Sequence, residues 1–478
     1  MKQKYLKRII SVLLVGAIAL SGCGCALQDK TANTVEQKLE PEQSKALSFD
    51  FIGGKDVMPI GGYIGPYSHS YSYDGNIFPY YNTDEIYQLL ADAGVNLITY
   101  TFTDYQTNPQ FIKESLELSE KYGIGLFVND KNITDKTQTD DVTADELAGF
   151  ISAYSDYPAF CGVHLVDEPR TVYFEPGNGK KLVPTYGQVA KLLHNELDMP
   201  SYLNILPIFD FSDEGKKDFV RYVKEFCDTL QPKFLCFDCY IFDKYRWGTE
   251  DMFFWMMDVI FQEAEARNLP VWTSIQAGSQ WSDGGQAFDS ETPYWPNEGQ
   301  FNWNFNVSLA YGVQGFQYFP LIQPESYSRA ITDGYDFERN GILGLMGNKT
   351  QWYNYSQNIT KHIREIDEVL MNSVNKGVIA SGEHVKKDLH LVTRTIESGK
   401  FQQLQSVDGD AMVGCFNYNG KTALYVVNYS TEYAQYITLG FDGTQNIKMI
   451  QGAETSYVKA ENLKLDMAAG EGVLLVIE

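Results

Sequence analysis

Residues 157–170 read YPAFCGVHLVDEPR. This apolar run, of the kind that forms a buried strand, ends on two adjacent carboxylates, Asp167 and Glu168, and a proline follows them directly. A parallel barrel carries its catalytic groups at the carboxyl ends of its strands, so an acid in this position is a candidate proton donor. The stretch therefore predicts a barrel strand with a reactive site at its end.

Seven further apolar segments, each bounded by Gly, Pro, Asn or Asp, resemble this one. With it they form the series 60–66, 96–101, 125–129, 162–166, 202–206, 234–240, 271–276 and 315–319. Their starts lie roughly 36 residues apart, close to the length of a βαβ unit, and seven intervals between them have a helical pattern. The alternation predicts an α/β fold, a (β/α)8 TIM barrel.

Local signals for helix ends agree with the barrel. Thr83 stands where a capping residue would open a helix that Gly94 closes, and Thr143 with Glu146 matches a capping box. Beyond the barrel, residues 349–371 predict a long amphipathic helix. Alternating apolar and polar residues then predict an antiparallel β-sandwich.

The N-terminus has the features of an export signal. Four basic residues precede an apolar stretch from Ile9 to Leu20, which is too short to span a bilayer. The stretch ends Leu20-Ser21-Gly22-Cys23, which resembles the lipobox of bacterial lipoproteins and implies lipidation of Cys23. A polar segment without aromatic residues follows, as in a disordered tether.

The expected domains are therefore a lipoprotein signal peptide at 1–22, a tether at 23–48, a barrel at 49–373 and a β-sandwich at 374–478. The expected location is extracytoplasmic, with a lipid anchor in the bacterial cell membrane as the only membrane contact.

Charge and cysteine content exclude several classes of function. Cleavage after residue 22 removes four positive charges and no negative ones, which moves the formal net charge from −24 to −28. Such an acidic body repels nucleic acids and polyanionic sugars, so a neutral glycan suits it better. Five of the seven cysteines lie in the expected folded domains, at positions 161, 227, 236, 239 and 415, and they have no regular spacing. No metal, phosphate or dinucleotide motif appears, so we expect no cofactor.

Residues 157–162 followed by Asp167-Glu168-Pro169 resemble the fourth strand of barrel glycoside hydrolases of the large retaining clan, in which Asn-Glu-Pro is the usual ending. Residues 308–319 are similar to the last helix and strand of β-galactosidase-like barrel proteins. The likeness covers roughly residues 57–325. It implies a hydrolase of O-glycosidic bonds with Glu168 as general acid.

Asp167 stands in place of the family's Asn, which usually contacts a sugar hydroxyl; it could do the same or pair with Arg170. Strand seven departs further, because Gln276 occupies the position where the clan has its nucleophilic glutamate, and glutamine cannot ionise. Asp238, near the end of strand six, is the nearest substitute. Strand spacing of roughly 9–10 Å between strands four and six favours a general base that activates water. Glu298, in the loop after strand seven, is a second substitute.

Aromatic residues predict the sugar contacts. Trp281 and Trp303 lie in a long polar segment after strand seven, and flat rings beside amides and carboxylates suit sugar faces. Tyr63 at the end of strand one and Tyr240 at the end of strand six are further expected contacts, together with Asp167 and Gln276.

Two functions remain open. The first is a surface-anchored glycoside hydrolase that acts on a neutral oligo- or polysaccharide. The second is a catalytically inactive glycan-binding lipoprotein, which the glutamine at position 276 suggests. A transporter's solute-binding lipoprotein would share the anchor, but it would show two similar lobes rather than eight units and a β-rich tail.

Overall fold

The eight predicted strands close into a parallel barrel in the computed structural model. The barrel order is β1, β10, β9, β8, β7, β6, β5 and β4. These strands are β1 (Ile60–Gly62), β4 (Leu97–Ile98), β5 (Gly125–Asn129), β6 (Phe160–Val166), β7 (Ser201–Ile205), β8 (Leu235–Phe237), β9 (Val271–Gln276) and β10 (Phe316–Phe319). Each expected segment overlaps one of them, so the predicted TIM barrel is confirmed.

The structure describes residues 39–40, 42, 46–66, 71–73, 76–78, 81–101, 103–138, 141–169, 182–242, 249–278, 295–323, 340–344 and 346–478. Cys23, Trp281 and Arg170 lie outside these ranges. All described residues belong to one compact unit, Lys38–Glu478.

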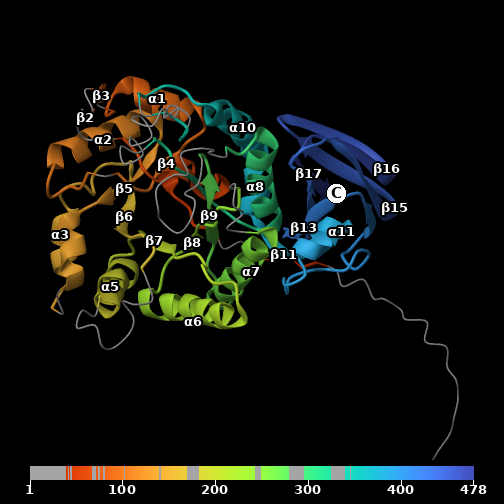
Figure 1. Ribbon diagram of the computed structural model, residues 1–478, viewed down its shortest axis with the longest axis horizontal. Coiled ribbons are helices and arrows are strands. Elements are labelled where there is room, and N and C mark those ends of the chain that lie inside the picture. The colour runs from red at the N-terminus through yellow and green to blue at the C-terminus, as the bar shows by residue number, and fades with distance from the viewer. Residues whose placement is uncertain are drawn as a thin grey trace, which may run out of the picture. The chain divides into compact units, whose positions relative to one another are not determined.

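Helices fill every interval between barrel strands and surround the strands, as Figure 1 shows. They are α1 (Asp84–Asp92), α2 (Pro109–Tyr122), α3 (Lys131–Thr134), α4 (Ala144–Ile151), α5 (Leu182–Lys191), α6 (Asp213–Leu230), α7 (Glu250–Arg267) and α8 (Glu298–Tyr311), with α10 (Gln351–Met371) after the last strand. A short hairpin, β2 (Tyr71–Tyr73) and β3 (Asn76–Phe78), lies in the first interval.

The predicted caps start their helices. The Thr83 hydroxyl accepts a hydrogen bond from the Ile86 amide at the start of α1, and the Thr143 hydroxyl accepts one from the Glu146 amide at the start of α4. Gly94 follows α1 with φ of 85°, a left-handed conformation that glycine adopts without strain.

The C-terminal domain is an antiparallel β-sandwich built from one continuous sheet. Its strands run in the order β11, β13, β14, β17, β15 and β12, with β16 paired to β15. They are β11 (Ser373–Ser381), β12 (Leu404–Asp408), β13 (Ala411–Tyr418), β14 (Lys421–Asn428), β15 (Gln435–Gln451), β16 (Glu454–Met467) and β17 (Gly472–Ile477), with the helix α11 (Glu383–Asp388) after β11. The register of β15 and β16 breaks between residues 440 and 445, and side chains on both sides of the break share one apolar core.

Two short segments that precede β1 pack against the folded domains, one against the barrel and one against the β-sandwich. Phe49, just before the barrel, packs in the barrel floor against Phe127 and Trp272, with ring centroids 5.9 and 6.1 Å away. Further upstream, the Glu40 carbonyl accepts a hydrogen bond from Asn417, and Lys376 pairs with Glu42. The end of the expected tether therefore contacts the β-sandwich instead of being wholly detached.

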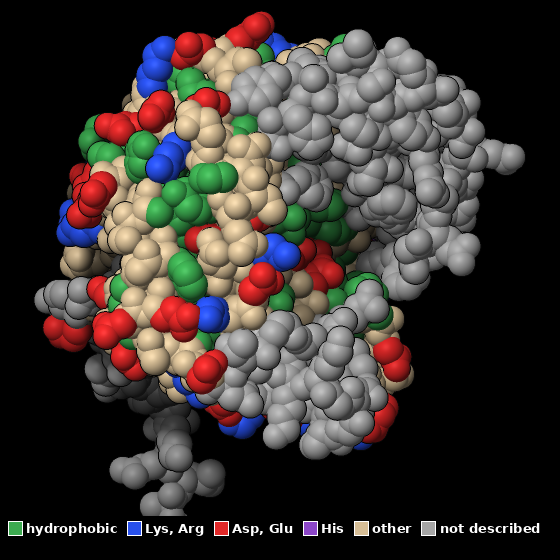
Figure 2. Space-filling view, turned by 90° about the vertical axis from the view of Figure 1, so that its left-hand side faces the viewer, with side chains coloured by type: hydrophobic (Ala, Val, Ile, Leu, Met, Phe, Trp, Pro, Cys, Tyr) green, Lys and Arg blue, Asp and Glu red, His purple; other side chains and the backbone are tan. Residues whose placement is uncertain are grey.

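Acidic side chains are spread over the face shown in Figure 2, with basic side chains among them. Within the part of the chain that the structure describes, no helix combines the length and the apolar character that crossing a membrane requires.

Candidate active site

The open end of the barrel at the carboxyl ends of its strands, here called the mouth, contains the predicted acids. Asp167 and Glu168 follow β6 directly; Asp167 is exposed and Glu168 is half-buried. Glu168 has a φ of 44°, a strained backbone conformation for a residue with a side chain. The turn is fixed from outside because the Tyr222 hydroxyl on α6 donates a hydrogen bond to the Pro169 carbonyl at 3.1 Å.

Asp238 lies two barrel strands away from β6, directly after β8, and its side chain meets Glu168. Only 5% of Asp238 is exposed, and its carboxyl is hydrogen-bonded to that of Glu168. Between them, Asn204 of β7 donates a hydrogen bond from Nδ2 to Asp238 Oδ1 at 2.6 Å. The same side chain hydrogen-bonds Asp167. We call Asp167, Glu168 and Asp238 the acid trio.

Burial decides how protons are shared in the acid trio. Burial raises the pKa of Asp238 well above its ordinary value of 3.8, and the neighbouring charges of Glu168 and Asp167 raise it further. The hydrogen bond to Glu168 acts in the same direction, so burial, the facing charges and this bond all favour the protonated form of Asp238. Burial also raises the pKa of Asp167, opposed by hydrogen bonds from Tyr63 and Asn204. The exposed edge of Asp167 weakens that effect relative to Asp238, because water screens it.

Four half-buried aromatic side chains surround the acid trio. Tyr63, at the end of β1, stacks on Tyr100 with ring centroids 4.7 Å apart, and its hydroxyl hydrogen-bonds Asp167. On the adjacent strand, Phe319 of β10 lies 6.1 Å from Tyr63 and stacks on Tyr240 with centroids 5.4 Å apart. Partly exposed rings beside carboxylates suit a sugar, whose C–H faces pack on rings while its hydroxyls form hydrogen bonds.

A polar layer lies one step deeper in the barrel and supports the mouth. His164 donates a hydrogen bond from Nδ1 to the Thr99 carbonyl at 3.1 Å and stacks on Tyr202. Gln317 donates a hydrogen bond to Cys236 Sγ at 3.2 Å. Burial lowers the pKa of His164 to about 4, so His164 is neutral at physiological pH. As a satisfied core histidine it orders the layer without contributing charge to the site.

The side chain of Gln276, expected to bind substrate, instead forms hydrogen bonds with backbone groups. Only 2% of its surface is exposed. Its Nε2 donates to the Phe242 carbonyl at 2.6 Å and to the Gly278 carbonyl at 3.1 Å, and its Oε1 accepts from the Phe242 amide at 3.2 Å. The side chain holds the segment after β8 in place, so a substrate contact would require these bonds to break.

The prediction that Trp303 contacts sugar is wrong. Trp303 lies on α8 with 1% of its surface exposed and packs against Phe253 and Phe254 of α7. Its ring has no free face for a ligand.

Glu298, the second proposed substitute for the nucleophile, is exposed at the start of α8, where it accepts a hydrogen bond from Asn358 of α10.

Three members of the site were not predicted as such: Asn204, Tyr100 and Phe319. Each lies at or directly after the carboxyl end of a predicted barrel strand, and this position was the available signal. In the described ranges, no group of three or more His, Cys, Asp or Glu side chains is arranged to hold a metal ion.

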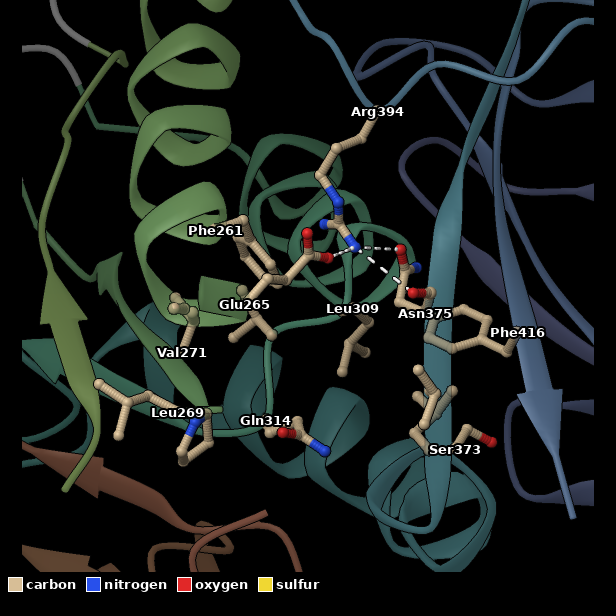
Figure 3. A pocket seen from close by; sticks show the side chains of 16 residues that line it. Phe261, Glu265, Leu269, Val271, Leu309, Gln314, Ser373, Asn375, Arg394 and Phe416 are labelled. Carbon is tan, nitrogen blue, oxygen red and sulfur yellow. Dashed lines mark hydrogen bonds and ion pairs between the residues drawn. The ribbon is translucent and has the colours of Figure 1, made fainter. Parts of the chain in front are cut away.

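A separate cavity of about 60 Å³ lies at the other end of the barrel strands. It is lined by the first residue of β9, Val271, by Gln314 before β10, and by residues of α7 and β11. Figure 3 shows Arg394 on its border, paired with Glu265 and hydrogen-bonded to Asn375. Because the acid trio lies at the opposite ends of the strands, this cavity is not part of the candidate active site.

No protein-family model matches the chain, and no curated protein matches it. Among solved structures, a β-galactosidase from the psychrophilic Marinomonas ef1 is similar with 8% sequence identity and a TM-score of 0.45, over 87% of this chain and 100% of that one. A glucosidase from Croceicoccus marinus has 11% identity and a TM-score of 0.43, over 92% and 96% of the two chains.

An inactive double mutant of MutB in complex with isomaltulose has 11% identity and a TM-score of 0.48, over 89% of this chain and 99% of that one. The barrel of the present chain is established by its own strand pairing.

Proposed function

We propose that this protein is a glycoside hydrolase that cleaves O-glycosidic bonds of a neutral oligo- or polysaccharide. The observation that carries the proposal is the hydrogen-bonded carboxyl pair of Glu168 and Asp238 at the mouth, among half-buried aromatic rings. Glycoside hydrolysis needs one protonated and one ionised carboxyl on either side of the bond, and a pair that shares one proton meets that need.

The burial of the two acids favours a division of roles opposite to the one expected from the sequence. Asp238 is the more buried acid and keeps its proton, so we assign it the role of general acid. Half-buried Glu168 is then the ionised partner, which attacks the sugar or activates water. The sequence had suggested Glu168 as acid and Asp238 as base, because it could not rank the burial of the two.

The spacing expected from strand geometry does not apply to this pair. Strands β6 and β8 are separated by β7, but their acids point toward each other and form a hydrogen bond in place of a gap. A bound glycoside would replace that bond by inserting its glycosidic oxygen between the two carboxyls. The separation with substrate, roughly 5–5.5 Å or 6.5–9.5 Å, then sets retention or inversion.

The test compares Asp238→Asn and Glu168→Gln on neutral glycans and on dinitrophenyl glycosides, whose leaving group needs no proton. Both variants lose roughly 10²- to 10⁴-fold on glycans. Asp238→Asn keeps most activity on dinitrophenyl glycosides, whereas Glu168→Gln loses it there too.

Glu298→Gln is the matched control, since this exposed acid lies at the start of α8 and is bonded to α10; its activity stays unchanged. The reverse leaving-group pattern would return the acid role to Glu168. A folded wild-type protein that releases no product from any neutral glycan would remove the hydrolase assignment.

A second function, glycan binding without chemistry, is favoured by one observation. The seventh barrel strand ends in Gln276, whose amide is fully engaged with the backbone of residues 242 and 278. In that case calorimetry would detect a bound oligosaccharide that is recovered intact after long incubation.

We further propose that the chain is a lipoprotein, anchored outside the cytoplasm through Cys23. The basic start, the apolar stretch and the ending Leu20-Ser21-Gly22-Cys23 support this. In a bacterial host, labelled fatty acid should be incorporated into the wild-type protein and not into Cys23→Ala. Equal labelling of both would exclude this anchor.

A further inference from the structure

Asn204 forms two contacts that join the acid trio across β7. Its Nδ2 donates to Asp238 Oδ1 at 2.6 Å, and the same side chain donates to the Asp167 carboxyl. Asp167 follows β6 and Asp238 follows β8, and β7 is the strand between them. One amide nitrogen has two N–H groups, so a single side chain can serve both acids.

The rest of the Asn204 side chain shows that the acids set its orientation. Asn204 is 3% exposed, and its Oδ1 is buried with no hydrogen-bond partner among the described residues. Leaving a buried acceptor unpaired is unfavourable and rare in folded proteins. The amide adopts this orientation because the opposite one would point its oxygen at two carboxyls.

We infer that Asn204 is a positioning residue that limits the acid trio to one shared proton, by donating hydrogen bonds that favour the ionised forms of Asp167 and Asp238. This inference rests on the proposed function for its catalytic meaning: a glycosidase needs one protonated and one ionised carboxyl, and a second proton would neutralise the ionised partner.

The other titratable side chains that the structure describes beside the acid trio are uncharged near neutral pH. Burial raises the pKa of every tyrosine and thiol that faces the acids, and it lowers that of His164. The tyrosines and thiols are Tyr63 of β1, Tyr100 after β4, Tyr202 of β7, Tyr222 of α6, and Cys236, Cys239 and Tyr240 of β8 and the segment after it. Among these described groups, only the carboxyls of the acid trio can therefore take up a proton near neutral pH.

The test replaces Asn204 with leucine, which has nearly the same volume and no N–H group. The protonated-carboxyl infrared absorption of the ligand-free full chain is followed during a pH titration. Asn204→Leu should move the midpoint of the acid trio upward by about one pH unit, since a hydrogen bond to a charged group corresponds to a shift of that order. Both limbs of the pH–rate profile should move with it.

The control is Asn306→Leu, which removes another buried amide; its contacts are with Gly470 and Tyr425, in the β-sandwich. It should leave the midpoint unchanged. If Asn204→Leu does not fold, Asn204→Ser, which keeps one donor, should show a smaller shift in the same direction.

The outcomes separate this inference from the proposed function. A shifted midpoint in a protein without hydrolase activity would uphold the role of Asn204 and remove the proposed function. An unshifted midpoint in a folded variant would overturn the role of Asn204 whether or not the protein hydrolyses glycans.

Discussion

Two of the buried acids of this molecule, Asp238 and Asp258, lie in different regions and have different partners. In the mouth, Asp238 is held by one amide and by a second carboxyl, that of Glu168. Where the barrel meets the β-sandwich, Asp258 of α7 is held by donors alone. Its Oδ1 accepts from the Tyr311 hydroxyl at 2.5 Å, and its Oδ2 accepts from Gln262 and from the amide and hydroxyl of Thr393.

The charged groups near Asp258 and near Asp238 differ in the same way. Beside Asp258, Arg394 pairs with Glu265 at 2.8 Å and lies over the rings of Phe261 and Tyr311. Each acid there is neutralised or fully hydrogen-bonded, as expected where packing is the only requirement. In the mouth, acids face acids, which opposes folding and is typical of a site that moves protons.

Replacing each buried aspartate by asparagine tests this comparison most directly. Asp238→Asn should lose at least 10²-fold in glycan hydrolysis while the free energy of unfolding near neutral pH stays level or rises. Asp258→Asn should behave in the opposite way: its new N–H groups meet donors in place of acceptors, which should lower the free energy of unfolding by roughly 2–3 kcal/mol. Its activity should be retained.

Urea unfolding and initial rates for the two variants provide the measurements. A large loss of stability in Asp238→Asn, or a loss of activity in a folded Asp258→Asn, would show that the two regions are not functionally distinct.

The barrel could be predicted from the sequence because its signals are local. Each strand segment is short, apolar and bounded by breaking residues, and caps such as Thr83 and Thr143 act within their own helix turn.

Trp303 was misplaced because the polar segment before it was taken to extend to residue 303. A capping box at Asn297 and Gln300 starts α8 earlier, and this signal was present in the sequence.

The carboxyl separation could not be predicted in the same way. Strand spacing fixes the distance between backbones, but the direction of Glu168 depends on a left-handed backbone angle, and that of Asp238 depends on Asn204. Gln276 presents a similar case: its partner, the backbone at residue 242, is 34 positions away in the chain. Contacts of this range leave no local pattern.

The smallest expected effect is the pH dependence of the free energy of unfolding, which further distinguishes Asp238 from Asp258. Because burial and the facing acids raise the pKa of Asp238, the folded protein binds a proton that the unfolded chain releases above an ordinary pKa of 3.8. Between that value and the folded pKa, the free energy of unfolding falls as pH rises, by up to about 1.4 kcal/mol per pH unit. The contribution is fully present below about pH 4 and is lost as pH rises through the folded pKa.

Asparagine at position 238 cannot ionise, so it removes this slope. The free energy of unfolding of Asp238→Asn minus that of wild type should therefore grow between about pH 5 and about pH 8, as measured by urea unfolding at each pH. The same difference for Asp258→Asn should be negative near neutral pH, because the new N–H groups meet hydrogen-bond donors in place of acceptors. A difference for Asp238→Asn that does not change with pH would mean that Asp238 is already ionised in the folded protein, and the general-acid role would then pass to Glu168.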